Sequence, residues 1–341
     1  MRQIKTIEAV GHIICHDITQ IVKDVVKDVA FRKGHVVTEA DIPVLLSLGK
    51  DHLYVWEKDE TKLHENEAAE ILCNLCQNEH MTATPVKEGK IELVAGCEGL
   101  FCIDTKRLEA VNDLDEIMIA TRHNFSPVQK GDKLIGTRVI PLVIEKVKME
   151  EAVKVVGETP LASLRPYRPL KAGIVTTGSE VYYGRIQDTF TPVIREKLSL
   201  YGMTVEEHIT VNDDKKKIQA AILALKEAGM ELIICTGGMS VDPDDLTPGA
   251  IAGTGAQIVT YGAPVLPGAM FLMGYFTDGT PIMGLPGCVM YTKATIFDLI
   301  LPRVAAGVTL TKKDFARLGH GGLCLGCKPC HYPNCSFGKG V

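Results

Sequence analysis

The hydrophobic positions after residue 170 follow two alternating spacings. Short apolar runs at Ala172 to Val175 and Glu231 to Cys235 predict buried strands, and Thr204 to Val211 is predicted as a further strand. Between these runs, Pro192 to Leu200 and Lys215 to Lys226 repeat apolar residues every three or four positions, which predicts helices. This alternation favours an α/β fold in which helices cover both faces of a mainly parallel sheet.

The expected helix ends agree with the residues found there. Thr191 can cap a helix that has Pro192 at its first position, and Asp213 or Asp214 can cap the next one. Gly229 suits the left-handed turn that ends a helix.

The first half of the chain has a less regular pattern, and we expect a mixed α+β region there. Helices are predicted at Gln20 to Val29, Asp41 to Leu48 and His64 to Cys76, and strands at Leu53 to Trp56, Ile91 to Ala95 and Arg138 to Val143.

A proline-rich stretch separates the two halves. Thr159 to Pro169 contains three Pro and no helix or strand period, so we interpret it as a linker. The predicted organisation is a mixed α+β region at 1–160, a linker at 161–169, an α/β domain at 170–310 and a Cys-rich tail at 311–341.

The amino-acid composition limits the classes of function that the protein could have. The 341 residues are 46% hydrophobic and 23% charged with a net charge of -5, which is typical of a globular protein and argues against nucleic acid as a partner. The apolar runs are shorter than the roughly 20 residues of a membrane span, and the first residues do not resemble a secretory leader. We therefore expect no membrane partner and a cytoplasmic location.

Three Gly-rich loops follow predicted strands. Glycine allows close backbone approach, exposed N–H groups attract phosphate, and Thr or Ser hydroxyls add donors. Any one such loop is more often a structural turn, but their repetition after strands indicates a phosphorylated small molecule. The residues expected to contact it are Thr176, Thr177, Gly178, Ser179, Thr236, Gly237, Gly238, Met239, Ser240, Pro286, Gly287 and Cys288.

Carboxylates accompany these loops. Mg²⁺ bound by Asp188, Asp242 and Asp245 would reconcile them with a phosphate, because both supply hard oxygen ligands. Glu180, Asp188 and Asp242 are the candidate catalytic residues. The alternative, weighted equally, is that Asp242, Asp244 and Asp245 form a solvated turn or helix cap.

Cysteine residues suggest two further sites. Cys324, Cys327, Cys330 and Cys335 form a C-x2-C-x2-C-x4-C run that could hold zinc or an iron–sulfur cluster, or could be a metal-free tail. Cys288 follows the third Gly-rich loop at an expected helix N-terminus, which would favour a thiolate able to act as a soft metal or sulfur ligand. A buried small side chain is the alternative there.

The three loops resemble the molybdopterin-binding domain of the MoeA/gephyrin family of molybdenum cofactor biosynthesis proteins. The resemblance covers about Leu170 to Gly307. Its matching residues are Thr177, Gly178, Glu180 and Asp188, then Gly237, Gly238, Ser240 and Val241, then Pro267 and Gly268, and finally Gly284, Leu285, Pro286 and Gly287.

This resemblance implies binding of molybdopterin or its adenylylated form (molybdopterin-AMP), with a divalent cation and molybdate in the insertion reaction. Several residues depart from the family pattern. Ser179 and Asp242 replace a family Asp and Gly, Ala269 and Met270 replace Lys-Pro, and Cys288 and Val289 replace Asn-Pro. The chain therefore resembles a variant branch of the family with a Cys-rich tail, and the resemblance suggests a homodimer.

Three functions fit these observations. The first is molybdopterin binding in cofactor biosynthesis or maturation, with molybdotransferase-like chemistry if the protein is an enzyme. The second is a non-enzymatic carrier that delivers the cofactor to a molybdoenzyme partner, and the third is a Mg-dependent nucleotide pyrophosphatase. Release of AMP from molybdopterin-AMP would distinguish an enzyme from a carrier.

Overall fold

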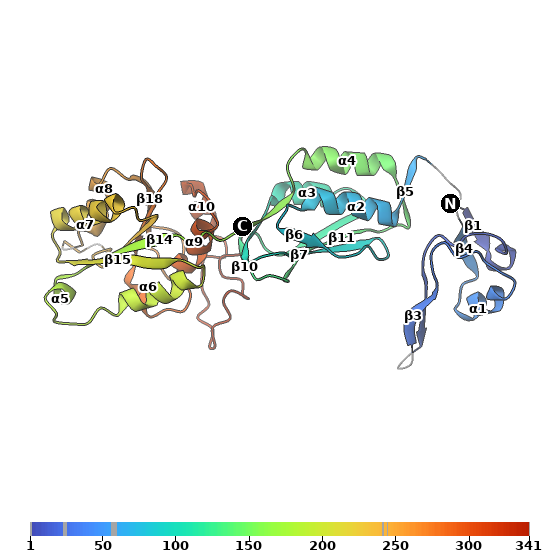
Figure 1. The fold of residues 1–341 in the computed structure, drawn as a ribbon, viewed down its shortest axis with the longest axis horizontal. Coiled ribbons are helices and arrows are strands. Elements are labelled where there is room, and N and C mark those ends of the chain that lie inside the picture. The colour runs from blue at the N-terminus through green and yellow to red at the C-terminus, as the bar shows by residue number, and fades with distance from the viewer. Residues whose placement is uncertain (1, 23–25, 56–59, 241, 244, 341) are drawn as a thin grey trace. The chain divides into compact units, whose positions relative to one another are not determined.

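The computed structural model describes residues 2–22, 26–55, 60–240, 242–243 and 245–340. Its contacts divide the chain into two compact units (Figure 1). The first unit comprises residues 1–94, 104–121 and 133–162, and the second comprises residues 95–103, 122–132 and 163–341.

The first unit is a mixed α+β region, as predicted. Its strands pair antiparallel as β1-β4, β2-β3, β5-β12 and β6-β7-β11-β9. They are β1 Arg2–Lys5, β2 Ile18–Val22, β3 Val26–Phe31, β4 His52–Val55, β5 Lys62–His64, β6 Met81–Ala83, β7 Lys90–Ala95, β9 Ile117–Thr121, β11 Lys133–Val139 and β12 Val143–Glu145. The helices are η1 Thr6–Glu8, α1 Asp41–Ser47, α2 Glu65–Cys76, α3 Thr105–Asn112 and α4 Lys146–Val156.

The helix predicted at Gln20 to Val29 is wrong, because β2 and β3 form an antiparallel hairpin there. The apolar residues of this stretch are Val and Ile, whose β-branched side chains fit strands better than helices. Val25, one of the residues behind that prediction, lies outside the described residues. The strand predicted at Arg138 to Val143 is also interrupted, since β11 ends at Val139 and β12 begins at Val143.

The second unit contains a six-stranded sheet of order β15-β14-β16-β19-β18-β17. The first four strands are parallel, and β18 and β17 are antiparallel to their neighbours. The bounds are β14 Lys171–Thr177, β15 Thr204–Val211, β16 Leu232–Thr236, β17 Gln257–Tyr261, β18 Leu272–Tyr275 and β19 Pro281–Leu285. This architecture confirms the α/β fold class predicted from the alternating pattern.

Helices cover both faces of this sheet (Figure 1). The helices are α5 Ser179–Tyr182, α6 Phe190–Ser199, α7 Lys215–Glu227, α8 Thr247–Gly253, η2 Gly287–Met290, α9 Ile296–Ala305 and α10 Lys312–Arg317. In β14, Ile174 packs into the core beneath α6 and α9, whereas the next residue, Val175, packs into the core beneath α7 and α8. Successive strand residues thus bury opposite faces, as a doubly covered sheet requires.

A second sheet of this unit has the order β10-β8-β13. Its strands are β8 Gly99–Ile103, β10 Ser126–Val128 and β13 Ala162–Pro166. The last of these lies within the stretch predicted as an irregular linker. Its pairing with β8 supplies the hydrogen-bonding partners that the local sequence pattern does not reveal.

Candidate functional site

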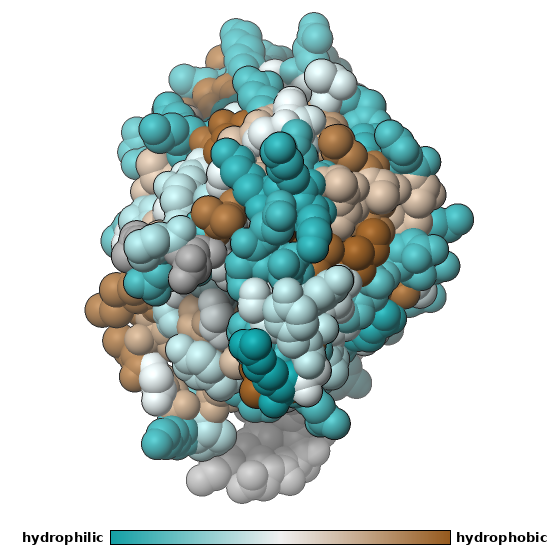
Figure 2. Space-filling view, turned by 90° about the vertical axis from the view of Figure 1, so that its left-hand side faces the viewer, coloured by the Kyte–Doolittle hydropathy of each residue, from teal (hydrophilic) through white to brown (hydrophobic). Residues whose placement is uncertain are grey.

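The three Gly-rich loops lie side by side at one edge of the six-stranded sheet. They follow β14, β16 and β19, which are adjacent and parallel, with Thr176 opposite Thr236 and Thr236 opposite Leu285. Because parallel strands end at the same edge, the loops at 176–180, 236–240 and 284–288 form one surface, which we call the loop edge. Figure 2 views the end of the unit that carries α5, where hydrophilic residues predominate.

A buried polar cluster lies beneath the first two loops. Thr176 and Thr236 are almost fully buried, and the Thr236 hydroxyl donates to Thr176 Oγ1 at 3.4 Å. Thr176 Oγ1 lies 2.9 Å from His208 Nε2 and donates to Asp188 Oδ2 at 3.3 Å. These bonds satisfy hydroxyls that would otherwise be costly to bury, so the cluster holds the strand ends in place.

Asp188 stabilises the start of α6 through hydrogen bonds. Its Oδ1 accepts from the amides of Phe190 (2.8 Å) and Thr191 (3.0 Å), and its Oδ2 accepts from the Thr191 hydroxyl at 2.5 Å. Burial alone would raise the pKa of Asp188, but these hydrogen bonds lower it below its usual value. The predicted cap Thr191 is therefore wrong, because Asp188 satisfies the first amides of α6 instead.

His208 is a site residue that the sequence pattern did not indicate. It lies on the edge strand β15, with Nε2 3.5 Å from Asp188 Oδ2. Burial lowers the pKa of His208, while the Asp188 charge acts in the opposite direction. A single His within a strand has no spacing signal, so only the folded structure brings it to this cluster.

The first loop turns sharply into α5. Gly178 has a φ of 135°, and a methyl group there would lie 3.0 Å from the Glu180 carboxylate. The Ser179 amide donates to Asp213 Oδ2 at 2.7 Å, so a carboxylate of the protein already uses this donor. Glu180 itself is exposed on the short helix.

Exposed aromatic and basic side chains adjoin the first loop. Tyr182, the last residue of α5, and Tyr183, which follows it, are in edge-to-face contact at 5.2 Å between ring centroids. Arg185 lies 5.3 Å from the Tyr183 ring centroid, and Lys217 lies 5.8 Å from that of Tyr182. Flat apolar surface and positive charge thus occur together beside the loop edge.

The second loop packs closely against the first. A methyl group at Gly237 would lie 2.2 Å from the Thr177 carbonyl oxygen, so glycine is required there for packing. The Thr177 hydroxyl lies 3.1 Å from that of Thr247. Gly238 also has a positive φ, of 54°.

Met239 and Ser240 have different environments in this loop. The Met239 side chain is buried, and a methyl group at Gly284 would lie 2.5 Å from its Cε. Met239 is therefore part of the core, and a ligand could contact only its backbone. Ser240 is exposed, and its carbonyl accepts from the Tyr261 hydroxyl at 3.2 Å.

The acidic residues after this loop form a turn. The Asp242 amide donates to Asp245 Oδ2 at 3.1 Å, and the Asp245 amide donates to the Asp242 carbonyl at 2.9 Å. This geometry has the features of the turn that was the alternative to a magnesium site. Val241 and Asp244 lie outside the described residues.

The third loop offers open space. Pro286 is buried, whereas Gly287 is exposed, and a methyl group there would meet no atom within 4 Å. Burial, together with the charge of Asp298, raises the pKa of the Cys288 thiol. This direction favours the alternative of a small, partly buried side chain over a thiolate, because desolvation outweighs the effect of the short turn η2.

The four tail cysteines are separate from the loop edge. Cys324, Cys327, Cys330 and Cys335 line a small cavity to which none of the three loops contributes. All four are free thiols. Across the described ranges, no three His, Cys, Asp or Glu side chains are arranged as a metal-binding group. Within the same ranges, no helix is long and apolar enough to cross a membrane.

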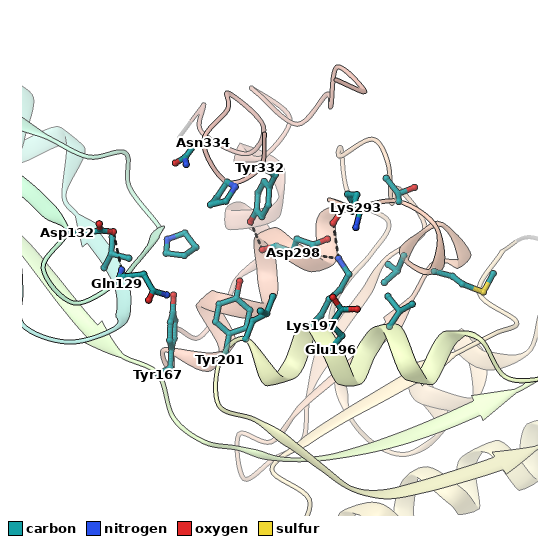
Figure 3. Close-up of a pocket in the computed structure, with 18 of the residues that line it drawn as sticks. Gln129, Asp132, Tyr167, Glu196, Lys197, Tyr201, Lys293, Asp298, Tyr332 and Asn334 are labelled. Atoms are coloured by element: carbon teal, nitrogen blue, oxygen red, sulfur yellow. Dashed lines mark hydrogen bonds and ion pairs between the residues drawn. The ribbon is translucent and has the colours of Figure 1, made fainter. Parts of the chain in front are cut away.

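A larger cavity of about 720 Å³ lies elsewhere in the second unit (Figure 3). Tyr167, Tyr201 and Tyr332 line it, and Lys197 forms an ion pair with Asp298 at its wall. The buried Tyr167 hydroxyl has no hydrogen-bond partner among the described residues. No sequence motif indicated this cavity, because its wall comes from segments far apart in the chain.

Two segments of the chain match known families. Residues 173–306 match the family described as "Probable molybdopterin binding domain", and residues 3–57 match a domain of unknown function, DUF8806. A "Putative competence-damage inducible protein" of Bacillus thuringiensis (strain Al Hakam) is 35% identical over 92 residues. The protein of the same name from Bacillus mycoides (strain KBAB4) is 36% identical over 92 residues. Each alignment covers 27% of this chain and 22% of the relative.

Solved structures also match in part. The molybdopterin biosynthesis enzyme MoaB of Thermus thermophilus is 22% identical, with 42% of this chain and 97% of that chain covered and a TM-score of 0.34. The tungsten cofactor synthesizing protein MoaB of Pyrococcus furiosus is 19% identical, with coverages of 40% and 88% and a TM-score of 0.32. CinA of Thermoplasma acidophilum, whose function is unknown, is 19% identical, with coverages of 34% and 88% and a TM-score of 0.30.

The family match and the observed sheet agree on one segment. Residues 173–306 include all three loops and the buried cluster beneath the first two. This segment is therefore similar to the family described as a probable molybdopterin binding domain.

Proposed function

We propose that the second unit binds molybdopterin or molybdopterin-AMP at the loop edge, in molybdenum cofactor biosynthesis or maturation. The observation that carries this proposal is the side-by-side placement of the three loops within the segment that matches the family. Within that superfamily we assign the chain to a variant branch of the MoeA/gephyrin type, on the loop residues and their departures from the family pattern.

The surroundings of the first loop suit both ends of such a ligand. A pterin ring can lie against Tyr182 or Tyr183, which expose flat aromatic surface. Arg185 and Lys217 supply positive charge for the phosphate. These two cations would compensate for the family Lys that is Ala269 in this chain.

The hydrogen bonds of Asp188 make it a poor candidate for a magnesium ligand. Both of its oxygens already accept hydrogen bonds, so binding Mg²⁺ there would sacrifice the cap of α6. Asp242 and Asp245 are the better candidates for Mg²⁺, since the Asp242 carboxylate is exposed beside the second loop. A carrier that passes the cofactor to a molybdoenzyme is the alternative to an enzyme at this site.

The experiment is to purify the protein from a host that makes the cofactor and identify released pterin by fluorescence. Gly287→Val is the test variant, because its side chain would project into open space at the loop edge without displacing protein atoms. Gly136→Val is the matched control, since Gly136 in β11 also has open space. We expect a loss of pterin of at least tenfold in G287V only; equal pterin content in G287V and wild type would contradict the site.

A turnover assay separates the remaining functions. With molybdopterin-AMP, molybdate and Mg²⁺, a carrier binds the pterin and releases no AMP, whereas a molybdotransferase releases AMP at a rate that depends on molybdate. Cleavage of nucleotide pyrophosphates without pterin binding would instead support the pyrophosphatase alternative.

A further inference from the structure

The tail, defined here as residues 318–340, is folded without regular structure. After α10 ends at Arg317, the tail contains no helix or strand, and its one bridge pairs Leu323 with Leu266. A packed segment of this kind needs some other source of order, because its backbone groups gain little from secondary structure.

Both ends of the tail are anchored to the core. Cys324 donates its amide to the Leu266 carbonyl at 2.8 Å. Towards the other end, the Tyr332 hydroxyl donates to the Asp298 carbonyl at 2.8 Å, and Phe337 is buried in the core. The two anchors fix where the segment starts and where it returns.

The segment between the anchors has few bonds of its own. The amide of Asn334 donates to the carbonyl of His331 at 2.7 Å, but within the described part of the chain no backbone hydrogen bond joins residues 325–330 to another group. Three of the four tail cysteines fall at or beside this stretch, at 324, 327 and 330.

All four cysteines nevertheless face one small space. Cys324, Cys327, Cys330 and Cys335 line a cavity of about 40 Å³ whose other lining includes the buried Phe337. A single ion could be bound there once the thiol side chains turn inward, since within the described residues no three of them already form a metal-binding group.

We propose that these four cysteines bind one Zn²⁺ ion as a tetrahedral structural site. Four thiolates at about 2.3 Å form one of the common closed structural zinc sites, and close ligand spacing in a loop is typical of them. The side chains are free thiols and must turn inward, so each gives its proton to solvent when its sulfur binds the metal. Zinc thus supplies the order that hydrogen bonds do not provide at 325–330.

Zinc binding would also fix part of the larger cavity. Tyr332, Pro333 and Asn334 lie between the last two cysteines and line the 720 Å³ cavity (Figure 3). Holding Cys330 and Cys335 on one ion therefore restrains the loop that carries this wall.

The test is metal analysis of the full chain, purified without added metal and after loading with Zn²⁺ under reducing conditions. We expect one zinc per chain and protection of four thiols from a thiol-modifying reagent. Substitution with Co²⁺ should give the absorption bands of a tetrahedral cobalt–thiolate centre. Cys327→Ser and Cys330→Ser should each lower the affinity for zinc at least tenfold, while Cys97→Ser, a half-buried cysteine outside the tail, should bind like wild type.

Several results would overturn the proposal. They are a zinc content far below one per chain after loading, unchanged zinc in C327S and C330S, or iron with inorganic sulfide in place of zinc. Because a tail variant could lose its fold, the wild-type chain is also treated with a chelator and reloaded. Faster amide exchange at 325–335 that reverses with Zn²⁺ is expected, and exchange indifferent to zinc would contradict the site.

Discussion

The loop edge and the tail belong to the same unit, yet they are held in different ways. At the loop edge, parallel strands fix three loops, and the hydroxyls of Thr176 and Thr236 bond beneath them. The tail has no strand or helix and depends on two anchors, with four thiols gathered between them. In the first region glycine occurs where neighbouring loops pack closely together. In the second region cysteine occurs where regular, hydrogen-bonded secondary structure is missing.

The largest expected effect concerns the tail anchor. Phe337→Ala should lower the free energy of unfolding by about 3–5 kcal/mol, because it removes a ring buried in the core of the second unit. Urea unfolding checks this. Leu325→Ala, at an exposed position of the same tail, is the control and should change stability by less than about 0.5 kcal/mol. Equally small losses of unfolding free energy in both variants would mean that the tail is not part of the core.

The next effect concerns packing at the loop edge. Gly237→Ala should lower the free energy of unfolding by about 3 kcal/mol. The new methyl group would lie 2.2 Å from the Thr177 carbonyl oxygen, and the residue keeps a φ of 83°. Gly255→Ala has a similar φ of 85° but open space, so it should cost about 1 kcal/mol. Chemical unfolding of both variants separates the stability lost through the steric contact from the stability lost through backbone strain. Matching losses would show that the loops are not closely packed.

A smaller effect is expected at the cap of α6. Asp188→Ala should lower the free energy of unfolding by about 2 kcal/mol, since it removes a cap and the carboxylate that accepts from the buried Thr176 and Thr191 hydroxyls. Asp214→Ala removes only the cap of α7 and should cost about 1 kcal/mol. Thermal unfolding compares the two variants. If D188A loses no more stability than D214A, the buried cluster does not contribute to stability through Asp188.

The smallest effect is a pH dependence. Burial lowers the pKa of His208 below 6.5, so the unfolded chain binds this proton more tightly than the folded chain. The stability due to neutral His208 is present above pH 6.5 and is lost as pH falls through the lower folded pKa. Between about pH 7 and 5, His208→Gln should therefore lose less stability than wild type. The exposed His12→Gln is the control, and parallel curves for H208Q and wild type would contradict the role of His208.

Sequence pattern predicted the second unit better than its site. The spacing of apolar residues predicted the strands and helices of the sheet, and Asp214 caps α7 as expected by accepting from the amides of Lys216 and Lys217. It failed for Gln20 to Val29, where a helical spacing of β-branched residues became a hairpin. Local periodicity does not report whether a partner strand is present.

The chemistry of individual side chains was harder to predict. Cys288 follows a Gly-rich loop, but its thiol pKa depends on burial, which the loop sequence does not reveal. Thr191 was the predicted cap of α6, and only the fold shows that Asp188 accepts from the first amides instead. His208 was missed because its partners, Thr176 and Asp188, come from other elements.

The most direct test of the central claim is hydrogen exchange of the full chain with and without bound molybdopterin. The account predicts slower amide exchange in all three loops, at 176–180, 236–240 and 284–288, with little change at 325–335. Protection confined to segments of the 720 Å³ cavity, such as 196–201 and 289–293, with unchanged exchange in the loops would contradict it.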